Sequence, residues 1–129
     1  MSLLQHILYS NGNKKEISWV ILTGNSKAEQ KRKHAEIYFD KISNIQSKYV
    51  ALHVGLFWGI GTFIIKNEDQ ITIKLDDKAM YEHLSMNEKN TDEFVEKRTQ
   101  FIRQIIHQRK LKIHYELITK EENMVGKTI

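Results

Sequence analysis

Residues 43–65 read SNIQSKYVALHVGLFWGIGTFII, and this stretch decides the fold. Its apolar side chains recur at spacings of four, three, four, four and three, which is the stripe of a helix. Further apolar residues widen that stripe, so we expect a helix that is buried on most of its sides. Gly55, Gly59 and Gly61 each cost about 1 kcal/mol relative to alanine inside a helix. Such small residues are justified where a helix lies closely across a sheet.

The same segment raises the question of a membrane span. Residues 49–65 are 17 residues between Lys48 and Lys66, which is the short limit for a helix that crosses a bilayer. His53 and the glycines weaken that interpretation, so we expect a core helix and no membrane association. The start Met1–Leu3 lacks the charged and then apolar pattern of a signal peptide, and the expected compartment is therefore the cytoplasm.

The composition indicates a globular protein. Of 129 residues, 40% are hydrophobic and 28% are charged, so we expect a single domain over residues 1–129 and no global disorder. Lysines and arginines number 20 and acidic residues 16, and the formal net charge of +4 favours a polyanionic partner. The sequence contains no cysteine, which excludes disulfides, thiolate metal sites and thiol nucleophiles.

Alternating apolar residues and turn signals predict the elements around the central helix. We expect three strands before it, then a strand, two helices and a last strand, over residues 4–9, 17–23, 35–42, 70–75, 77–84, 90–110 and 112–118. Asn90 or Thr91 is expected to cap the long helix, and residues 26–34 to be a loop or the hydrated end of a strand. The order β-β-β-α-β-α-α-β predicts an α/β fold with helices flanking a five-stranded mixed sheet.

Four stretches, which occur in this order along almost the whole chain, resemble type I ribonuclease H. Residues 9–12 (YSNG) resemble the family's Tyr-x-Asp-Gly motif on the first strand. Residues 43–56 resemble its helix Thr-Asn-x-x-Ala-Glu-Tyr-x-Ala-Leu followed by Gly-Leu. Residues 71–78 (ITIKLDDK) resemble its strand that ends in Asp-Ser, and residues 120–126 (KEENMVG) resemble Arg-Glu-x-Asn-x-x-Ala-Asp. The resemblance implies a ribonuclease H-like fold.

The family hydrolyses RNA in RNA–DNA hybrids with two divalent cations, which four acidic residues hold through oxygen ligands. Carried over position by position, three of those acids become Asn11, Lys48 and Gly126, and only Asp76 is retained. An ammonium group in place of the helix glutamate repels Mg²⁺. The resemblance therefore implies a degenerate, inactive member with no bound cofactor. Mg²⁺ or Mn²⁺ is expected only if the protein is active.

Two interpretations of Lys48 are open. In the first, its ammonium stands in for a metal ion, neutralises Asp76 and touches a nucleic-acid phosphate. In the second, the two residues form a surface ion pair worth less than about 1 kcal/mol. Asn44 matches a family position that contacts nucleic acid, although Ser43 and Asn44 also have the composition of a helix cap. Asn13 and Lys78 complete the expected nucleic-acid-binding residues.

Other acidic residues are candidate substitute ligands for a metal. Asp77 follows the retained aspartate, although an aspartate before a short helix is also a typical N-cap. Glu36 and Asp40 share one face of the expected third strand, where they either complete a metal site or form solvated pairs with Lys33 and Lys41.

Two histidines and two basic segments complete the candidates. His53 on the apolar helix is expected to be a core or edge residue. His83 is either a proton shuttle near the retained aspartate or a surface residue. Residues 27–33 and 103–112 are basic and suit a polyanion, or are hydrated ends of elements.

Three hypotheses for the function follow. The chain is a non-catalytic module that binds an RNA–DNA hybrid or duplex, or that serves in protein assembly. Alternatively, it is an active hybrid-cleaving nuclease with substituted ligands. A third hypothesis is a pure protein–protein module, with a protein partner or a second copy of the chain.

Overall fold

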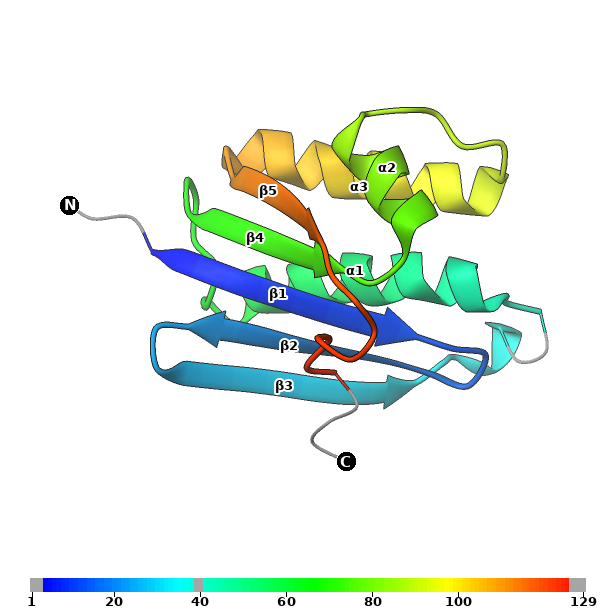
Figure 1. Ribbon diagram of the computed structural model, residues 1–129, viewed down its shortest axis with the longest axis horizontal. Coiled ribbons are helices and arrows are strands. Elements are labelled where there is room, and N and C mark those ends of the chain that lie inside the picture. Colours follow the sequence, from blue (N-terminus) through cyan, green and yellow to red (C-terminus); the bar gives the residue numbers. More distant parts are fainter. Residues whose placement is uncertain (1–3, 39–40, 126–129) are drawn as a thin grey trace.

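The computed structural model describes residues 4–38 and 41–125, which form one five-stranded sheet with helices packed against it (Figure 1). The elements are β1 (Gln5–Gly12), β2 (Glu16–Thr23), β3 (Ser26–Lys33), a short 3-10 helix (Glu36–Tyr38), α1 (Asn44–Gly61), β4 (Gln70–Leu75), α2 (Lys78–Ser85), α3 (Glu93–Arg109) and β5 (Lys112–Leu117). The strand order is β3-β2-β1-β4-β5. The first three strands are antiparallel, and β1, β4 and β5 are parallel, so the predicted order and the mixed sheet are confirmed.

The third strand lies outside the predicted range. β3 covers residues 26–33 and not residues 35–42, of which Glu36–Tyr38 form the 3-10 helix. β3 is an edge strand whose side chains are exposed or half-buried, so burial imposes no apolar alternation on its sequence. Its position is set by the two-residue connection after Thr23, where Gly24 takes the left-handed conformation with φ +57°. The chain then pairs with β2 along the full length of the strand.

The helix α1 covers one face of the sheet and supplies much of the core (Figure 1). Leu52 and Leu56 of α1 are fully buried in the same cluster as Trp19 of β2 and Ile73 of β4. The helix α3 packs beside α1 and adds Ile102 to that cluster. Among the described residues, no helix is long and apolar enough to cross a membrane.

The opposite face of the sheet is covered in part by the chain after β5. Figure 1 shows this segment crossing β1. Ile118 packs with Tyr9 and Val20 in a second, smaller apolar cluster, against which Met124 and Val125 also pack. This crossing brings the segment from residue 119 to residue 125 close to the end of β1, where it contributes to the site described below.

Helix ends follow the predicted capping chemistry at two of three positions. Ser43 caps α1 through a capping box with Gln46, and Asp77 caps α2 by accepting a hydrogen bond from the Met80 N–H. The cap of α3 is Asp92, not Asn90 or Thr91 as predicted. Asn90 instead accepts a hydrogen bond from the Asp92 N–H and orients the capping residue.

Glycine is required where the first turn of α1 meets the end of β1. A methyl group added at Gly12 would lie 2.5 Å from the Ser47 carbonyl oxygen, which is closer than real Cβ contacts allow. At Gly55 the added methyl would lie 3.0 Å from Trp19 Cβ and Cγ. No atom lies within 4 Å of the corresponding position at Gly61. The expected close packing of the helix therefore holds for Gly55 but gives no reason for Gly61.

We expect Gly12→Ala to lower the free energy of unfolding by about 1–3 kcal/mol, because the new methyl group displaces the α1 backbone. Gly61→Ala is the matched control, and we expect it to leave the free energy unchanged or to raise it by up to about 1 kcal/mol. Urea denaturation followed by circular dichroism measures both. If the two variants were equally stable, the close approach at Gly12 would not constrain the fold.

Candidate functional site

A polar cavity of about 400 Å³ lies where β1 and β4 end and α1 begins. Because the two strands are parallel, their carboxyl ends meet at the same edge of the sheet, which is where sites in such sheets form. The cavity is lined by Asn11, Gly12, Asn13, Asn44, Ile45, Lys48, Asp76, Asp77, Lys120, Asn123 and Val125.

An ion pair forms part of this lining. Lys48 Nζ lies 3.2 Å from Asp76 Oδ1 and 3.9 Å from Asp77 Oδ2. The side chains of Lys48 and Asp76 are only 17% and 7% exposed, so the pair is not the surface contact of the second interpretation. Lys48 directly follows Ser47, the residue of α1 that Gly12 approaches closely. The packing of α1 against β1 therefore determines where the Lys48 ammonium group lies.

A buried amide holds the other side of Asp76. Asn123 Nδ2 donates to Asp76 Oδ2 at 2.9 Å and to the Ser10 carbonyl oxygen at 3.2 Å. Asn123 is 2% exposed, and it comes from the segment after β5. The carboxylate of Asp76 therefore has an ammonium partner on one oxygen and an amide donor on the other, which satisfies a buried charge.

The residues of this cavity do not fit a pair of divalent cations. The ammonium of Lys48 is already within ion-pair distance of both aspartates, and it repels a cation at that position. Within residues 4–38 and 41–125, no group of three or more His, Asp or Glu side chains is placed to hold a metal ion. Asn11, at the position of the first acid, lines the cavity, and its Oδ1 accepts a hydrogen bond from the Gly12 N–H at 2.9 Å.

Of the other predicted site positions, one lies away from this cavity, one lines it, and two are not described. Glu36 is exposed and does not line the cavity, because it belongs to the 3-10 helix Glu36–Tyr38 and not to a strand. Asp40 and Gly126 lie outside the described residues. Asp77 lines the cavity at 30% exposure, and its carboxylate also caps α2, as the alternative interpretation predicted.

The predicted nucleic-acid-binding residues separate into two groups. Asn44 and Lys48 line the cavity, and so does Asn13, although its Oδ1 is engaged by the Lys15 and Glu16 N–H groups in the β1–β2 turn. Lys78 lies apart from the lining. Its side chain is 78% exposed and 4.0 Å from Glu82, which is a solvated helix pair.

Sequence reasoning did not assign Lys120 and Asn123 to the site. The available signal was the likeness of residues 120–126 to a family motif that contains an asparagine at the position of Asn123. A polar tail after the last strand gives no periodicity, so the sequence pattern alone did not indicate that Asn123 is buried.

His83 is buried and contacts Tyr49 of α1. His83 is 5% exposed, so the surface interpretation is wrong, and its Nδ1 lies 2.7 Å from the Tyr49 hydroxyl. Burial and the neighbouring Arg103 lower the pKa of His83, which favours its neutral form. His83 is not among the residues that line the cavity.

His53 lies at the edge of the core, as predicted. It stacks on Phe101, which is 43% exposed, with ring centroids 5.8 Å apart. Burial and the Arg98 guanidinium, which lies 3.1 Å from His53 Nδ1, lower the pKa of His53 to about 4.

No protein-family model and no curated protein matches the sequence. Solved structures do match the fold. The N-terminal RNase H domain of a Mycobacterium tuberculosis protein, solved as a fusion with maltose-binding protein, has a TM-score of 0.72 at 14% identity, over 97% of this chain and 89% of its own. RNase H1 from the archaeon Halobacterium salinarum has a TM-score of 0.68 at 12% identity, over 98% of this chain and 93% of its own.

A third similar structure is LC11-RNase H1 in complex with an RNA/DNA hybrid. Its TM-score is 0.74 at 13% identity, over 97% of this chain and 91% of its own. These identities are low, so the likeness establishes the fold alone. The chain has a ribonuclease H-like fold, as the sequence resemblance implied.

We expect Lys48→Met to lower the free energy of unfolding by about 1–3 kcal/mol, because the nearly buried Asp76 loses its only cationic partner within the described structure. Lys78→Met removes an exposed lysine from the neighbouring helix and should change the free energy by less than about 0.5 kcal/mol. Urea denaturation of both variants gives the comparison. Equal effects would mean that the Lys48 ion pair contributes nothing to the fold.

Proposed function

We propose that this chain is a nucleic-acid-binding domain that contacts the phosphate backbone at the cavity and does not hydrolyse it. The observation that carries the proposal is the Lys48 ammonium, which lies 3.2 Å from Asp76, with both residues in the cavity lining. A two-metal hydrolase needs carboxylates that are free to bind cations, and here a side chain of the protein neutralises the retained one.

The charge of the lining supports binding of a phosphate without a metal. The cavity has two lysines, Lys48 and Lys120, and two aspartates, Asp76 and Asp77, so its formal charge is 2 − 2 = 0. Four acids at the corresponding family positions would repel a phosphate unless metal ions neutralised them. The remaining polar lining is formed by asparagines, whose amide N–H groups donate to phosphate oxygens.

Exposed lysines surround this end of the sheet. The β1–β2 turn carries Lys14 and Lys15, and β3 ends at Lys33, which pairs with Glu16 at the start of β2. All three lysines are exposed, and they lie at the end of the sheet where β1 reaches Gly12. Each lysine that neutralises a phosphate releases counterions and adds salt-dependent affinity. The basic segment 103–112 contributes nothing here, because α3 ends where β4 and β5 begin.

An RNA–DNA hybrid is the first ligand to test, and RNA and DNA duplexes are the second. One structure of the same fold, LC11-RNase H1, was solved with an RNA/DNA hybrid. Amides and lysines that read the backbone do not depend on base sequence, so we expect shape and sugar chemistry to decide among the ligands.

We expect the unaltered chain to bind hybrid with an affinity that falls steeply with salt, as measured by fluorescence anisotropy at several salt concentrations. Lys48→Gln should weaken binding. It should also reduce the magnitude of the slope of log affinity against log salt by about 0.9, which corresponds to the loss of one phosphate contact. Lys78→Gln is the matched control and should leave both unchanged. Circular dichroism confirms that each variant is folded.

Two outcomes would contradict this proposal. Absence of binding at low salt to hybrid, duplex and single strand would favour a protein–protein module, for which size measurement tests a second copy of the chain. Cleavage of hybrid by the unaltered chain with Mg²⁺ or Mn²⁺ would favour the active nuclease. A known ribonuclease H in the same assay is the positive control.

Restoring acids should create a magnesium site. We expect calorimetry to detect Mg²⁺ binding by the triple variant Asn11→Asp, Lys48→Glu and Gly126→Asp, because carboxylates then replace the amide and the ammonium group that line the cavity with Asp76. The unaltered chain and the variant Lys78→Glu are the controls, and neither should take up magnesium. A triple variant that is folded and binds no Mg²⁺ would mean that the site has been placed wrongly.

A further inference from the structure

The basic segment 103–112 borders a second cavity, which nucleic-acid binding at the first cavity does not use. The second cavity has a volume of about 560 Å³ and lies between α2, the carboxyl-terminal half of α3 and β5, the last strand in the sheet order. Sites for small molecules in proteins have volumes of this order. The segment supplies five of the lining residues, which are Arg103, Ile106, His107, Lys110 and Leu111.

The lining residues of α3 and of β5 lie on facing sides of this cavity. Arg103, Ile106 and His107 are spaced by three residues and by one, so they share one side of α3. Ile113 and Tyr115 are two residues apart on β5, so their side chains lie on one face of the sheet. Both pack against the main core cluster, which identifies that face as the one that the helices cover.

An apolar wall forms the inner side of the cavity. Leu84 of α2 and Leu111 line it and are buried. Ile106 and Ile113 also line it but are only half-buried, so they leave apolar surface facing the cavity. A ligand with an apolar body would remove this surface from water, which is favourable.

The exposed side of the cavity is positively charged. Arg103, His107 and Lys110 line it, and no aspartate or glutamate of the described residues does. Arg103 is half-buried, and its Nη2 donates to the carbonyl oxygens of His83 and Glu88 at 3.3 Å each. These bonds hold the guanidinium in place, and its Nη1 and Nε groups have no partner within the part of the chain that the structure describes. A guanidinium held with unused N–H donors is suited to a carboxylate.

Tyr115 adds a neutral donor to this lining. Its ring is half-buried, and no residue of the described ranges hydrogen-bonds its hydroxyl group. Burial raises the pKa of Tyr115 to about 12, although the Arg103 charge acts to lower it. The hydroxyl group is therefore protonated at neutral pH and can donate a hydrogen bond to an anion beside Arg103.

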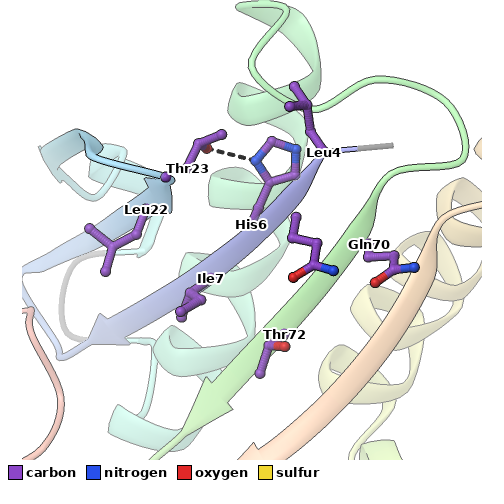
Figure 2. Close-up of a pocket in the computed structure, with 9 residues that line it drawn as sticks. Leu4, His6, Ile7, Leu22, Thr23, Gln70 and Thr72 are labelled. Carbon is purple, nitrogen blue, oxygen red and sulfur yellow. Dashed lines mark hydrogen bonds between the residues drawn. The ribbon is translucent and has the colours of Figure 1, made fainter. Parts of the chain in front are cut away.

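A larger cavity, of about 670 Å³, lacks these charges. It opens where β1 and β4 begin, and Figure 2 shows Ile7 and Leu22 beside it. Its described lining contains no lysine, arginine, aspartate or glutamate, so an anion has no charged partner there. His6 borders it but is 2% exposed, and its ring nitrogens are tied to Thr23 at 2.7 Å, dashed in Figure 2, and to Asp69 at 2.8 Å. The protein thus contains one basic and one uncharged cavity that can be compared.

We propose that the cavity between α2, α3 and β5 binds a small organic carboxylate with an apolar body. Its carboxylate lies against Arg103 and Lys110. Its apolar body lies against Ile106 and Ile113. The charge of the segment alone would suit a nucleic acid, but a phosphate backbone offers nothing to cover the apolar wall. The proposal does not depend on nucleic-acid binding, because the two cavities share no lining residue.

Octanoate tests this proposal in a titration of the full chain, followed by amide NMR. We expect changes in the chemical shifts of residues 103–115 and none in residues 5–7 and 70–72, which lie at the uncharged cavity. Acetate has the same carboxylate without the apolar chain. It should bind at least tenfold more weakly, because it buries far less apolar surface.

Arg103→Gln should weaken octanoate binding about tenfold or more, because it removes a charge-assisted hydrogen bond. Arg109→Gln is the matched control and should leave binding unchanged, because Arg109 belongs to the same helix and does not line the cavity. Lys110→Asn should also weaken binding, and asparagine tolerates the left-handed conformation of residue 110. Circular dichroism checks folding, and if Arg103→Gln unfolds, Lys110→Asn still decides.

Three results would overturn the proposal. The first is equal affinity of Arg103→Gln, Lys110→Asn and Arg109→Gln for octanoate. The second is shift changes confined to the uncharged cavity of Figure 2, or equal binding of acetate and octanoate. The third is displacement of octanoate by a DNA duplex at residues 103–115, which would assign this surface to nucleic acid. None of them bears on whether the first cavity binds a phosphate backbone.

Discussion

The rest of the structure depends on how closely α1 approaches the sheet. The absence of a side chain at Gly12 lets the first turn of the helix touch the end of β1, and Gly55 lets its middle touch Trp19. This contact is a backbone constraint, so it leaves little freedom for the position of the helix. Lys48 follows Ser47, the residue against which Gly12 packs, and its ammonium therefore reaches Asp76 at the end of β4. A packing requirement in the core thus determines the electrostatics of the cavity.

Elements whose burial imposes a period on their sequence could be predicted, and elements without that constraint could not. The strand over residues 70–75 was placed at its observed bounds, and the central helix begins where it was predicted, because both bury apolar side chains at regular spacing. The helix ends at Gly61, although its predicted apolar stripe continued to Phe63. β3 has no such spacing, because it is an exposed edge strand that a turn and backbone hydrogen bonds hold in place. The apolar alternation of residues 35–42 therefore predicted a strand where Glu36–Tyr38 form a 3-10 helix.

The same distinction applies to the candidate site. The motifs on α1 and at the end of β4 predicted that Lys48 lies close to Asp76, because regular elements place their side chains at predictable positions. Asn123 completes the site from a segment of irregular structure, for which sequence offers no periodicity. The contact of His6 with Asp69 joins residues 63 positions apart, and no local pattern reports a pairing across that distance. Long-range polar contacts of this kind need the assembled sheet before they can be recognised.

The edge strand β3 also affects how copies of the chain meet. Among the described strands it has a hydrogen-bonded neighbour on one side only, and its other side offers backbone groups to which a further strand could add. Its sequence, SKAEQKRK, carries four basic residues in eight. A second copy approaching this edge would bring the same positive charges, and their repulsion opposes aggregation through continued β-pairing. The basic, non-alternating sequence of β3, which gave no sign of a strand in the sequence, thus opposes aggregation of the protein through this edge.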